Sequence, residues 1–154
     1  MAKKFKFKIT VLTEKEHKKL GMNLILAVNS ASRFPPRTVV LEYNGNPKSK
    51  EGFAIVGKGI TFDSGGLNLK PTNYIETMRM DMSGAAIVLG TLKSVAELGL
   101  KVNLLTVFTT TENLIGKGAY KPGDTFRAFN GKTVEIGNTD AEGRVILADA
   151  IEYA

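Results

Sequence analysis

Acidic residues in this chain gather at the ends of predicted strands and the starts of predicted helices. The sequence contains only five aspartates, and three of them, Asp63, Asp81 and Asp140, fall in such junctions. Glu142 follows Asp140 by two residues. A single junction aspartate is usually a helix cap or a turn residue. Four carboxylates in one place, however, would be too anionic to stay ionised and buried without cations. We therefore expect two divalent metal ions of the kind with which hydrolytic enzymes ionise water.

Basic residues accompany these carboxylates. Lys58 follows an apolar run and lies five residues before Asp63, so its amine could be a metal ligand or simply balance charge. As a ligand it would have to be neutral, which neighbouring cations favour by lowering its pKa. On spacing alone, Lys70 is interpreted as a loop charge and Arg144 as an ion-pair partner of Glu142.

The segments that would position these residues alternate between helices and strands. Short β-branched runs predict buried strands, helical spacing and a Thr13–Glu16 capping box predict helices, and Asn130-Gly131 predicts a hairpin turn. The strands are expected at 6–12, 37–43, 52–57 and 102–111, the helices at 13–20, 83–100 and 141–153, and the hairpin at 124–136. This order indicates a single α/β domain, residues 1–154, with a mixed, mostly parallel sheet flanked by helices.

Composition excludes several kinds of site. The 154 residues contain no cysteine and one histidine, His17, so thiolate zinc sites, iron–sulfur clusters and multi-histidine metal sites are excluded. No stretch approaches the roughly 18 uninterrupted apolar residues of a membrane span, and the N-terminus has no apolar signal core. We expect a cytoplasmic protein without a membrane partner.

The net charge of +6 arises mainly from lysines near the N-terminus. Such a patch could bind nucleic acid through phosphate contacts, in which case binding would be sensitive to salt. The segment has no groove-reading or base-stacking motif, so we interpret it as a solvated basic face and do not expect a nucleic-acid partner.

Three of the polar junctions also resemble motifs of a known family. The segment Asn-Thr-Asp-Ala-Glu-Gly-Arg at 138–144 is identical to the signature of the leucine aminopeptidase family of dinuclear metallopeptidases. The segment Val-Gly-Lys-Gly-Ile-Thr-Phe-Asp-Ser-Gly-Gly at 56–66 is similar to that family's other metal-binding motif. Further matches, in the family's order and spacing, lie at 78–86, 120–124 and 130–133.

The resemblance implies a role for each of these residues. One metal would be bound by Lys58, Asp63, Asp81 and Glu142, and the other by Asp63, Asp140 and Glu142. Lys70 matches the catalytic lysine that polarises the scissile carbonyl and stabilises the oxyanion. Arg144 matches the arginine that holds a bicarbonate ion as general base, and Met78 matches a residue lining the pocket for the N-terminal side chain of the substrate.

The implied reaction is hydrolysis of the first peptide bond of a peptide with a free N-terminus, with two zinc or manganese ions as cofactors. Family members are longer, and we expect this chain to be the metal-binding half of a catalytic domain, without the family's N-terminal domain and the C-terminal half of its catalytic domain. The alternative is a metal-binding, self-assembling fragment with little turnover. A homo-oligomer is expected in either case, because the family forms hexamers and apolar faces such as Val145, Leu147, Ala148 and Ile151 would be exposed.

Overall fold

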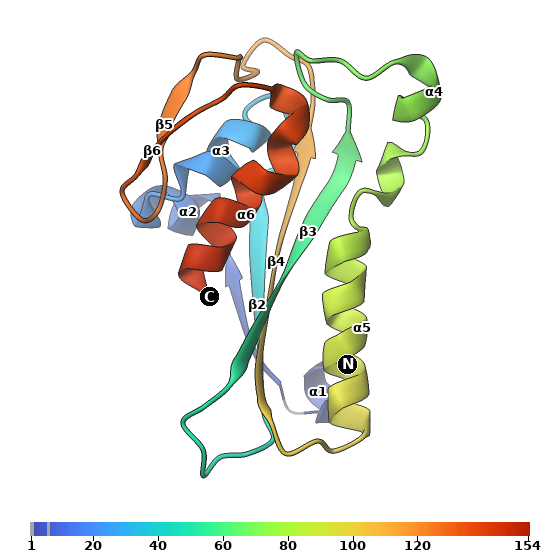
Figure 1. The fold of residues 1–154 in the computed structure, drawn as a ribbon, viewed down its shortest axis with the longest axis vertical. Coiled ribbons are helices and arrows are strands. Elements are labelled where there is room, and N and C mark those ends of the chain that lie inside the picture. The colour runs from blue at the N-terminus through green and yellow to red at the C-terminus, as the bar shows by residue number, and fades with distance from the viewer. Residues whose placement is uncertain (1, 6) are drawn as a thin grey trace.

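The chain forms a four-stranded sheet with helices on both faces and a small separate hairpin, as a computed structural model describing residues 2–5 and 7–154 shows (Figure 1). In chain order the elements are α1 (Ala2–Phe5), β1 (Lys8–Leu12), α2 (Glu14–Leu20), α3 (Asn23–Asn29), β2 (Arg37–Asn44), β3 (Phe53–Asp63), α4 (Thr72–Ile75), the 3-10 turn η1 (Met78–Met80), α5 (Ser83–Glu97), β4 (Asn103–Asn113), β5 (Thr125–Arg127), β6 (Thr133–Glu135), the 3-10 turn η2 (Thr139–Ala141) and α6 (Glu142–Tyr153). None of the helices in these residues is long and apolar enough to cross a membrane. Lys6, at the start of the first predicted strand, lies outside the described residues.

The strand order of the sheet is β1-β2-β4-β3. β1 pairs with β2 and β2 with β4 in antiparallel fashion, whereas β3 and β4 run parallel. The prediction of a mixed α/β sheet is therefore confirmed. The expectation that most of the sheet is parallel is wrong, because only the crossover through α5 joins neighbouring parallel strands.

The two faces of the sheet carry different helices. On one face Leu41 of β2 packs with Leu92 of α5, and on the other Val40 packs with Ala150 of α6. Neighbouring residues of β2 therefore serve opposite layers, as the alternation of side chains along a strand requires. Helix α3 lies beside α6 and contributes to a third cluster with Ile60 at the end of β3.

Strand β3 and helix α5 approach each other very closely at two glycines. A Cβ atom on Gly57 would lie 2.7 Å from the carbonyl oxygen of Gly84, and one on Gly84 would lie 2.8 Å from the backbone nitrogen of Lys58. Any side chain at either position would clash with main-chain atoms, so glycine is required for this approach. The contact places the turn before α5 directly beside the middle of β3.

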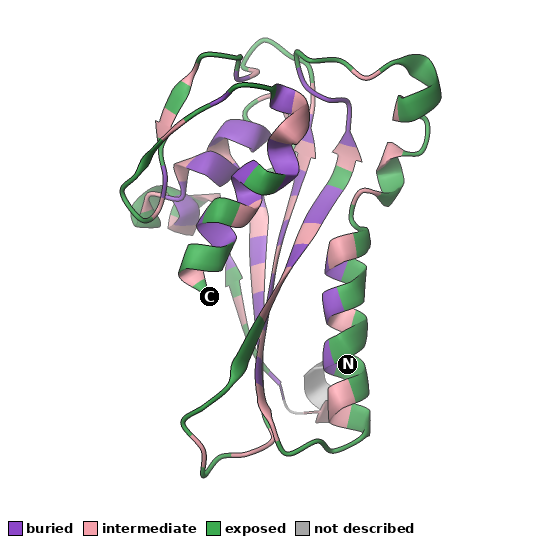
Figure 2. Ribbon diagram, in the orientation of Figure 1, coloured by how far each residue is buried: buried purple, intermediate pink, exposed green. Residues whose placement is uncertain are grey.

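Two of the predicted elements differ from the observed ones. Strand β3 continues to Asp63 instead of ending at Gly57, because it pairs with β4 along its whole length with one irregularity near residues 60–62. In α6 the expected exposed apolar face is only partly present: Ala148 and Ile151 are exposed, Leu147 is half-buried, and the expectation is wrong for Val145, which is buried. Figure 2 shows the exposed and buried sides of α6 and α5. The hairpin and the capping box, in contrast, form as predicted.

Candidate metal centre

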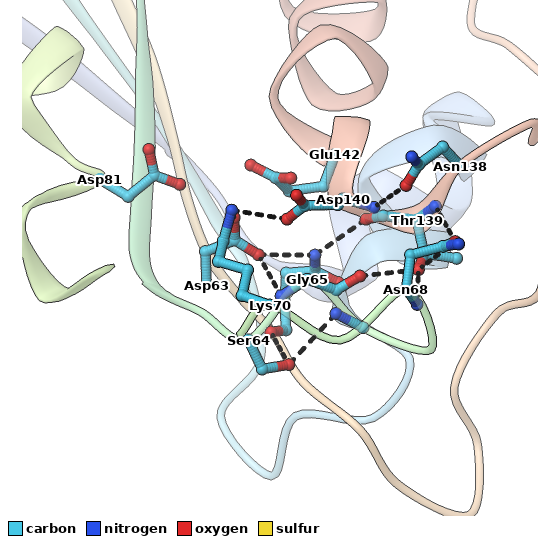
Figure 3. A network of polar contacts seen from close by, with 12 residues as sticks. Asp63, Ser64, Gly65, Asn68, Lys70, Asp81, Asn138, Thr139, Asp140 and Glu142 are labelled. Atoms are coloured by element: carbon cyan, nitrogen blue, oxygen red, sulfur yellow. Dashed lines mark hydrogen bonds and ion pairs between the residues drawn. The ribbon is translucent and has the colours of Figure 1, made fainter. Parts of the chain in front are cut away.

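Three carboxylates meet where β3 ends and α6 begins. Asp63, Asp140 and Glu142 each offer an oxygen, and these oxygens all lie within 4.8 Å of one another. Asp63 is the last residue of β3, Asp140 lies in η2, and Glu142 is the first residue of α6. The fold thus joins two of the acidic junctions that the sequence predicts to be functional (Figure 3).

Asp81 reaches the same region through Lys58. The Lys58 Nζ lies 2.7 Å from Asp81 Oδ2 and 2.6 Å from Glu142 Oε1. Asp81 belongs to the turn just before α5, which the glycine contact with β3 holds in place. In Figure 3 Asp81 faces the other carboxylates from the side opposite Asn138 and Thr139.

A second ammonium group lies between the remaining carboxylates. The Lys70 Nζ is 3.0 Å from Asp63 Oδ2 and 2.6 Å from Asp140 Oδ1. The loop interpretation of Lys70 is correct for its backbone, but its side chain is largely buried and belongs to the cluster. Burial lowers the pKa of Lys70, yet its hydrogen bonds to Asp140 and Asp63 outweigh this effect, and the net pKa is raised.

Burial strongly affects the carboxyl group of Glu142. Its side chain is 1% exposed, and burial raises the pKa of its carboxyl group to about 7, against the lowering effect of Lys58 and with a further increase from Asp63. Its second oxygen, Oε2, is buried and has no hydrogen-bond partner among residues 2–5 and 7–154. For Lys58, the hydrogen bonds to Asp81 and Glu142 overcome the lowering effect of burial and raise the pKa.

Two predicted site residues take no part in the ion pairs of this cluster. Arg144, in the first turn of α6, is exposed and makes no ion pair within the described part of the chain. Its interpretation as a partner of Glu142 is therefore wrong, since Lys58 occupies that place. Met78 begins η1, is half-buried and lies in an element packed against β3.

Sequence reasoning missed the buried polar residues whose hydrogen bonds support the segments that carry the cluster. Thr139 Oγ1 donates to the carbonyl of Gly65 (2.7 Å), and the Tyr120 hydroxyl donates to the carbonyl of Thr139 (2.8 Å). Asn113 donates to both Asp63 and Thr139. A signal for Asn113 exists, because it ends the strand paired in parallel with β3 and so shares the sheet edge of Asp63.

The model of the cytosol aminopeptidase family, catalytic domain, matches residues 1–154. The chain belongs to the cytosol aminopeptidase family. The resemblance drawn from the motifs is thus confirmed, and the carboxylate cluster lies within the family's catalytic domain.

Individual relatives agree with this assignment. The chain is 52% identical to a probable cytosol aminopeptidase of Fusobacterium nucleatum over 99% of its length, and 52% identical to another of Protochlamydia amoebophila over 96%. It spans only 32% and 30% of those relatives. A leucine aminopeptidase structure from Caenorhabditis elegans matches 99% of the chain with a TM-score of 0.94 at 40% identity, and the match covers 31% of that structure. A leucyl aminopeptidase from Trypanosoma brucei, solved in complex with bestatin, matches with a TM-score of 0.94 at 37% identity over 99% of this chain and 29% of that one.

The residues present fit the divalent ions that a metal-dependent family implies. Four carboxylates and two ammonium groups leave two negative charges over when all are ionised. A buried carboxylate oxygen without a hydrogen-bond partner, such as Glu142 Oε2, costs free energy unless a cation satisfies it. Lys58 would have to lose its proton to bind a metal; a cation held by the same carboxylates would favour that loss.

Proposed function

We propose that this chain carries the two-metal centre of an aminopeptidase that hydrolyses the first peptide bond of peptides with a free N-terminus. The single observation that supports it most is the convergence of oxygens from Asp63, Asp140 and Glu142 within 4.8 Å. Oxygen and amine donors suit either zinc or manganese. Membership of the cytosol aminopeptidase family supplies the reaction class.

The proposed ligand sets share two carboxylates. One ion would be held by Lys58, Asp63, Asp81 and Glu142, and the other by Asp63, Asp140 and Glu142. The contacts of Lys58 with Asp81 and Glu142 support the first set, and the mutual approach of the three acids supports the second. When bound, the two ions would ionise a water molecule and polarise the peptide carbonyl.

The other residues would act on the substrate. The raised pKa of Lys70 keeps its amine protonated at neutral pH, so it can donate to the scissile carbonyl and stabilise the oxyanion that forms there. Arg144 is exposed in the first turn of α6, two residues after Glu142, and would hold a bicarbonate ion as proton acceptor. Met78 would line the pocket for the N-terminal side chain.

Hydrolysis of leucyl-p-nitroanilide, with and without added Mn²⁺ or Zn²⁺, tests this function. We expect metal-dependent release of p-nitroaniline and, by elemental analysis after dialysis, two ions per folded chain. A folded chain that retains no metal would contradict the dinuclear assignment. A chain that binds two ions but releases no product would instead support the alternative, a metal-binding fragment with little turnover.

We also propose that the chain self-associates. Several large apolar side chains are exposed, including Phe53 (69%), Ile87 (67%) and Leu98 (73%). Burial of such side chains against another copy would be favourable. Light scattering coupled to size exclusion should give a mass that is a multiple of 16.7 kDa; a particle of one chain's mass at micromolar concentration would contradict this.

The remaining proposals concern location and the basic N-terminal face. The names of the relatives favour a cytoplasmic protein. Of the N-terminal lysines, Lys8 pairs with Glu42 and Lys18 with Glu14, which reduces the charge available to phosphates. We therefore do not propose a nucleic-acid partner, and the absence of salt-sensitive DNA binding would agree with this.

A further inference from the structure

Asn113 donates hydrogen bonds to both segments that carry the carboxylate cluster, the end of β3 and the Thr139–Glu142 segment. It is the last residue of β4, its side chain is fully buried, and it is paired in register with Asp63 at the end of β3. The amide Nδ2 donates to Asp63 Oδ1 at 2.8 Å and to the carbonyl of Thr139 at 2.9 Å. One amide group thus joins the end of β3 to the segment that immediately precedes Asp140.

Two hydrogen bonds to the same carboxylate oxygen orient Asp63. Asp63 Oδ1 accepts from Asn113 and also from the backbone N–H of Gly65, at 2.8 Å. The other oxygen, Oδ2, is thereby directed toward the Lys70 amine and the cluster. Since an amide donates hydrogen bonds without carrying charge, Asn113 orients this carboxylate and leaves its negative charge available to a cation.

The hydrogen bond to the Thr139 carbonyl positions the segment that carries Asp140 and Glu142. The Thr139 carbonyl also accepts from the Tyr120 hydroxyl. Two buried donors therefore fix the peptide group immediately before Asp140. Without the Asn113 amide, Asp63 and this segment would still be joined through two loop residues: Gly65 donates to Asp63 and accepts from Thr139 Oγ1, and Lys70 pairs with Asp63 and Asp140. The spacing of oxygens from β3 and α6 would then depend on the loop contacts alone.

We propose that Asn113 is a positioning residue for the metal centre, which sets Asp63 and the Thr139–Glu142 segment in place before any ion binds. The proposal rests on the proposed metallopeptidase function. Polar groups that orient metal ligands typically contribute about 10- to 100-fold to metal affinity. Asn113 does not need to touch the ion or the substrate to do so.

Calorimetric titration of the chain with Mn²⁺ tests the proposal with the variant Asn113→Ala. The matched control is Asn29→Ala, because Asn29 is also buried and its Nδ2 also donates twice, to the carbonyl of Phe34 (2.8 Å) and to Thr111 Oγ1 (2.9 Å). We expect Asn113→Ala to weaken Mn²⁺ binding by about 10- to 100-fold and Asn29→Ala to leave it unchanged. Because only affinity is lost, hydrolysis by Asn113→Ala should recover at saturating Mn²⁺.

A second variant, Asn113→Leu, removes both donors but fills the space, in case the alanine variant does not fold. Wild-type affinity in either folded Asn113 variant would overturn the proposal. So would failure of both variants to fold while Asn29→Ala folds, since Asn113 would then hold the fold and not the site. If the unaltered chain itself binds no Mn²⁺, the proposed function fails, and this inference fails with it.

Discussion

The amine of Lys58 lies 2.6 Å from Glu142 Oε1, and the glycine that follows Glu142 makes this approach possible. A Cβ atom on Gly143 would lie 2.8 Å from Cδ and 2.9 Å from Cε of Lys58. The first turn of α6 therefore leaves a gap through which the lysine side chain passes on its way to Glu142 and Asp81. The contact links the middle of β3 to the start of α6.

Replacement of Gly143 by alanine should therefore affect the site more than the fold. The new methyl group would push the flexible end of Lys58 aside, so we expect weaker Mn²⁺ binding and slower hydrolysis, with the melting temperature unchanged or slightly raised. Gly90→Ala is the matched control, because Gly90 also lies in a helix and a Cβ there meets nothing within 4 Å. Its expected effect is a gain of about 1 kcal/mol in stability and no change in metal binding. Equal Mn²⁺ affinity in both variants would show that the Lys58 contact is dispensable.

Asp63→Ala should abolish metal binding and hydrolysis together. Asp63 is proposed to belong to both ligand sets, and its carboxylate is 2% exposed, so no water-exposed residue can easily replace it. Elemental analysis and the leucyl-p-nitroanilide assay on the same sample check this. Asp124→Ala, which removes a carboxylate paired with Lys121 at 3.2 Å, serves as control and should retain both. Retention of two ions by Asp63→Ala would contradict the bridging role.

Lys70→Ala should lower kcat while leaving the metal content intact. Loss of an oxyanion-stabilising group typically costs a factor of about 10² to 10³ in kcat. Metal binding should persist because removal of the ammonium group makes the surroundings of Asp63 and Asp140 more negative. Lys121→Ala, at an exposed ion pair, is the control for loss of a lysine. Loss of metal from Lys70→Ala would show that its role has been misassigned.

The stability of the fold should depend on pH through His17. This histidine is fully buried, its Nε2 is 2.9 Å from Thr38 Oγ1, and burial lowers its pKa from 6.5 to about 4. The unfolded chain then binds more protons between these values, so the contribution of His17 to the free energy of unfolding falls as pH decreases from about 6.5 toward 4. Between pH 7 and 5.5 the loss should be about 1 kcal/mol.

The measurement is urea unfolding of the unaltered chain and of His17→Gln at both pH values. The raised pKa of Glu142 acts in the opposite direction, because the folded state then binds the extra proton, so only the difference between the two proteins reports on His17. Identical pH dependence in both proteins would mean that His17 titrates normally.

The positions of the site carboxylates could be predicted from the sequence because they follow local rules. Asp63 ends a strand and Asp140 and Glu142 begin a helix, and in α/β folds ligand sites lie at such junctions. The pairing of Lys58 with Asp81 could not be predicted in this way. It depends on the close backbone contact between β3 and α5, which is a property of the packed layers.

The buried side of helix α6 could not be predicted from the sequence alone. Charged residues are mostly exposed, so helical periodicity gives no reason to expect Asp149 on the buried side. In the structure the Asp149 carboxylate is buried and accepts from the backbone N–H groups of Leu24, Ile25 and Phe129. The acid thus caps α3, whose own N-cap residue provides no side-chain bond, and such a partner from a distant helix leaves no mark in local periodicity.

The contact between Gly57 and Gly84 also limits which parts of the chain can vary without consequence. Where a helix packs on a strand through side chains, a change in their size forces shifts of the backbone. Here main-chain atoms meet directly, so the separation between Asp81 and Lys58 does not depend on the volume of the apolar residues further along α5. Apolar residues such as Leu92 could be exchanged for others of different shape, at a cost in stability, while this edge of the metal centre keeps its dimensions.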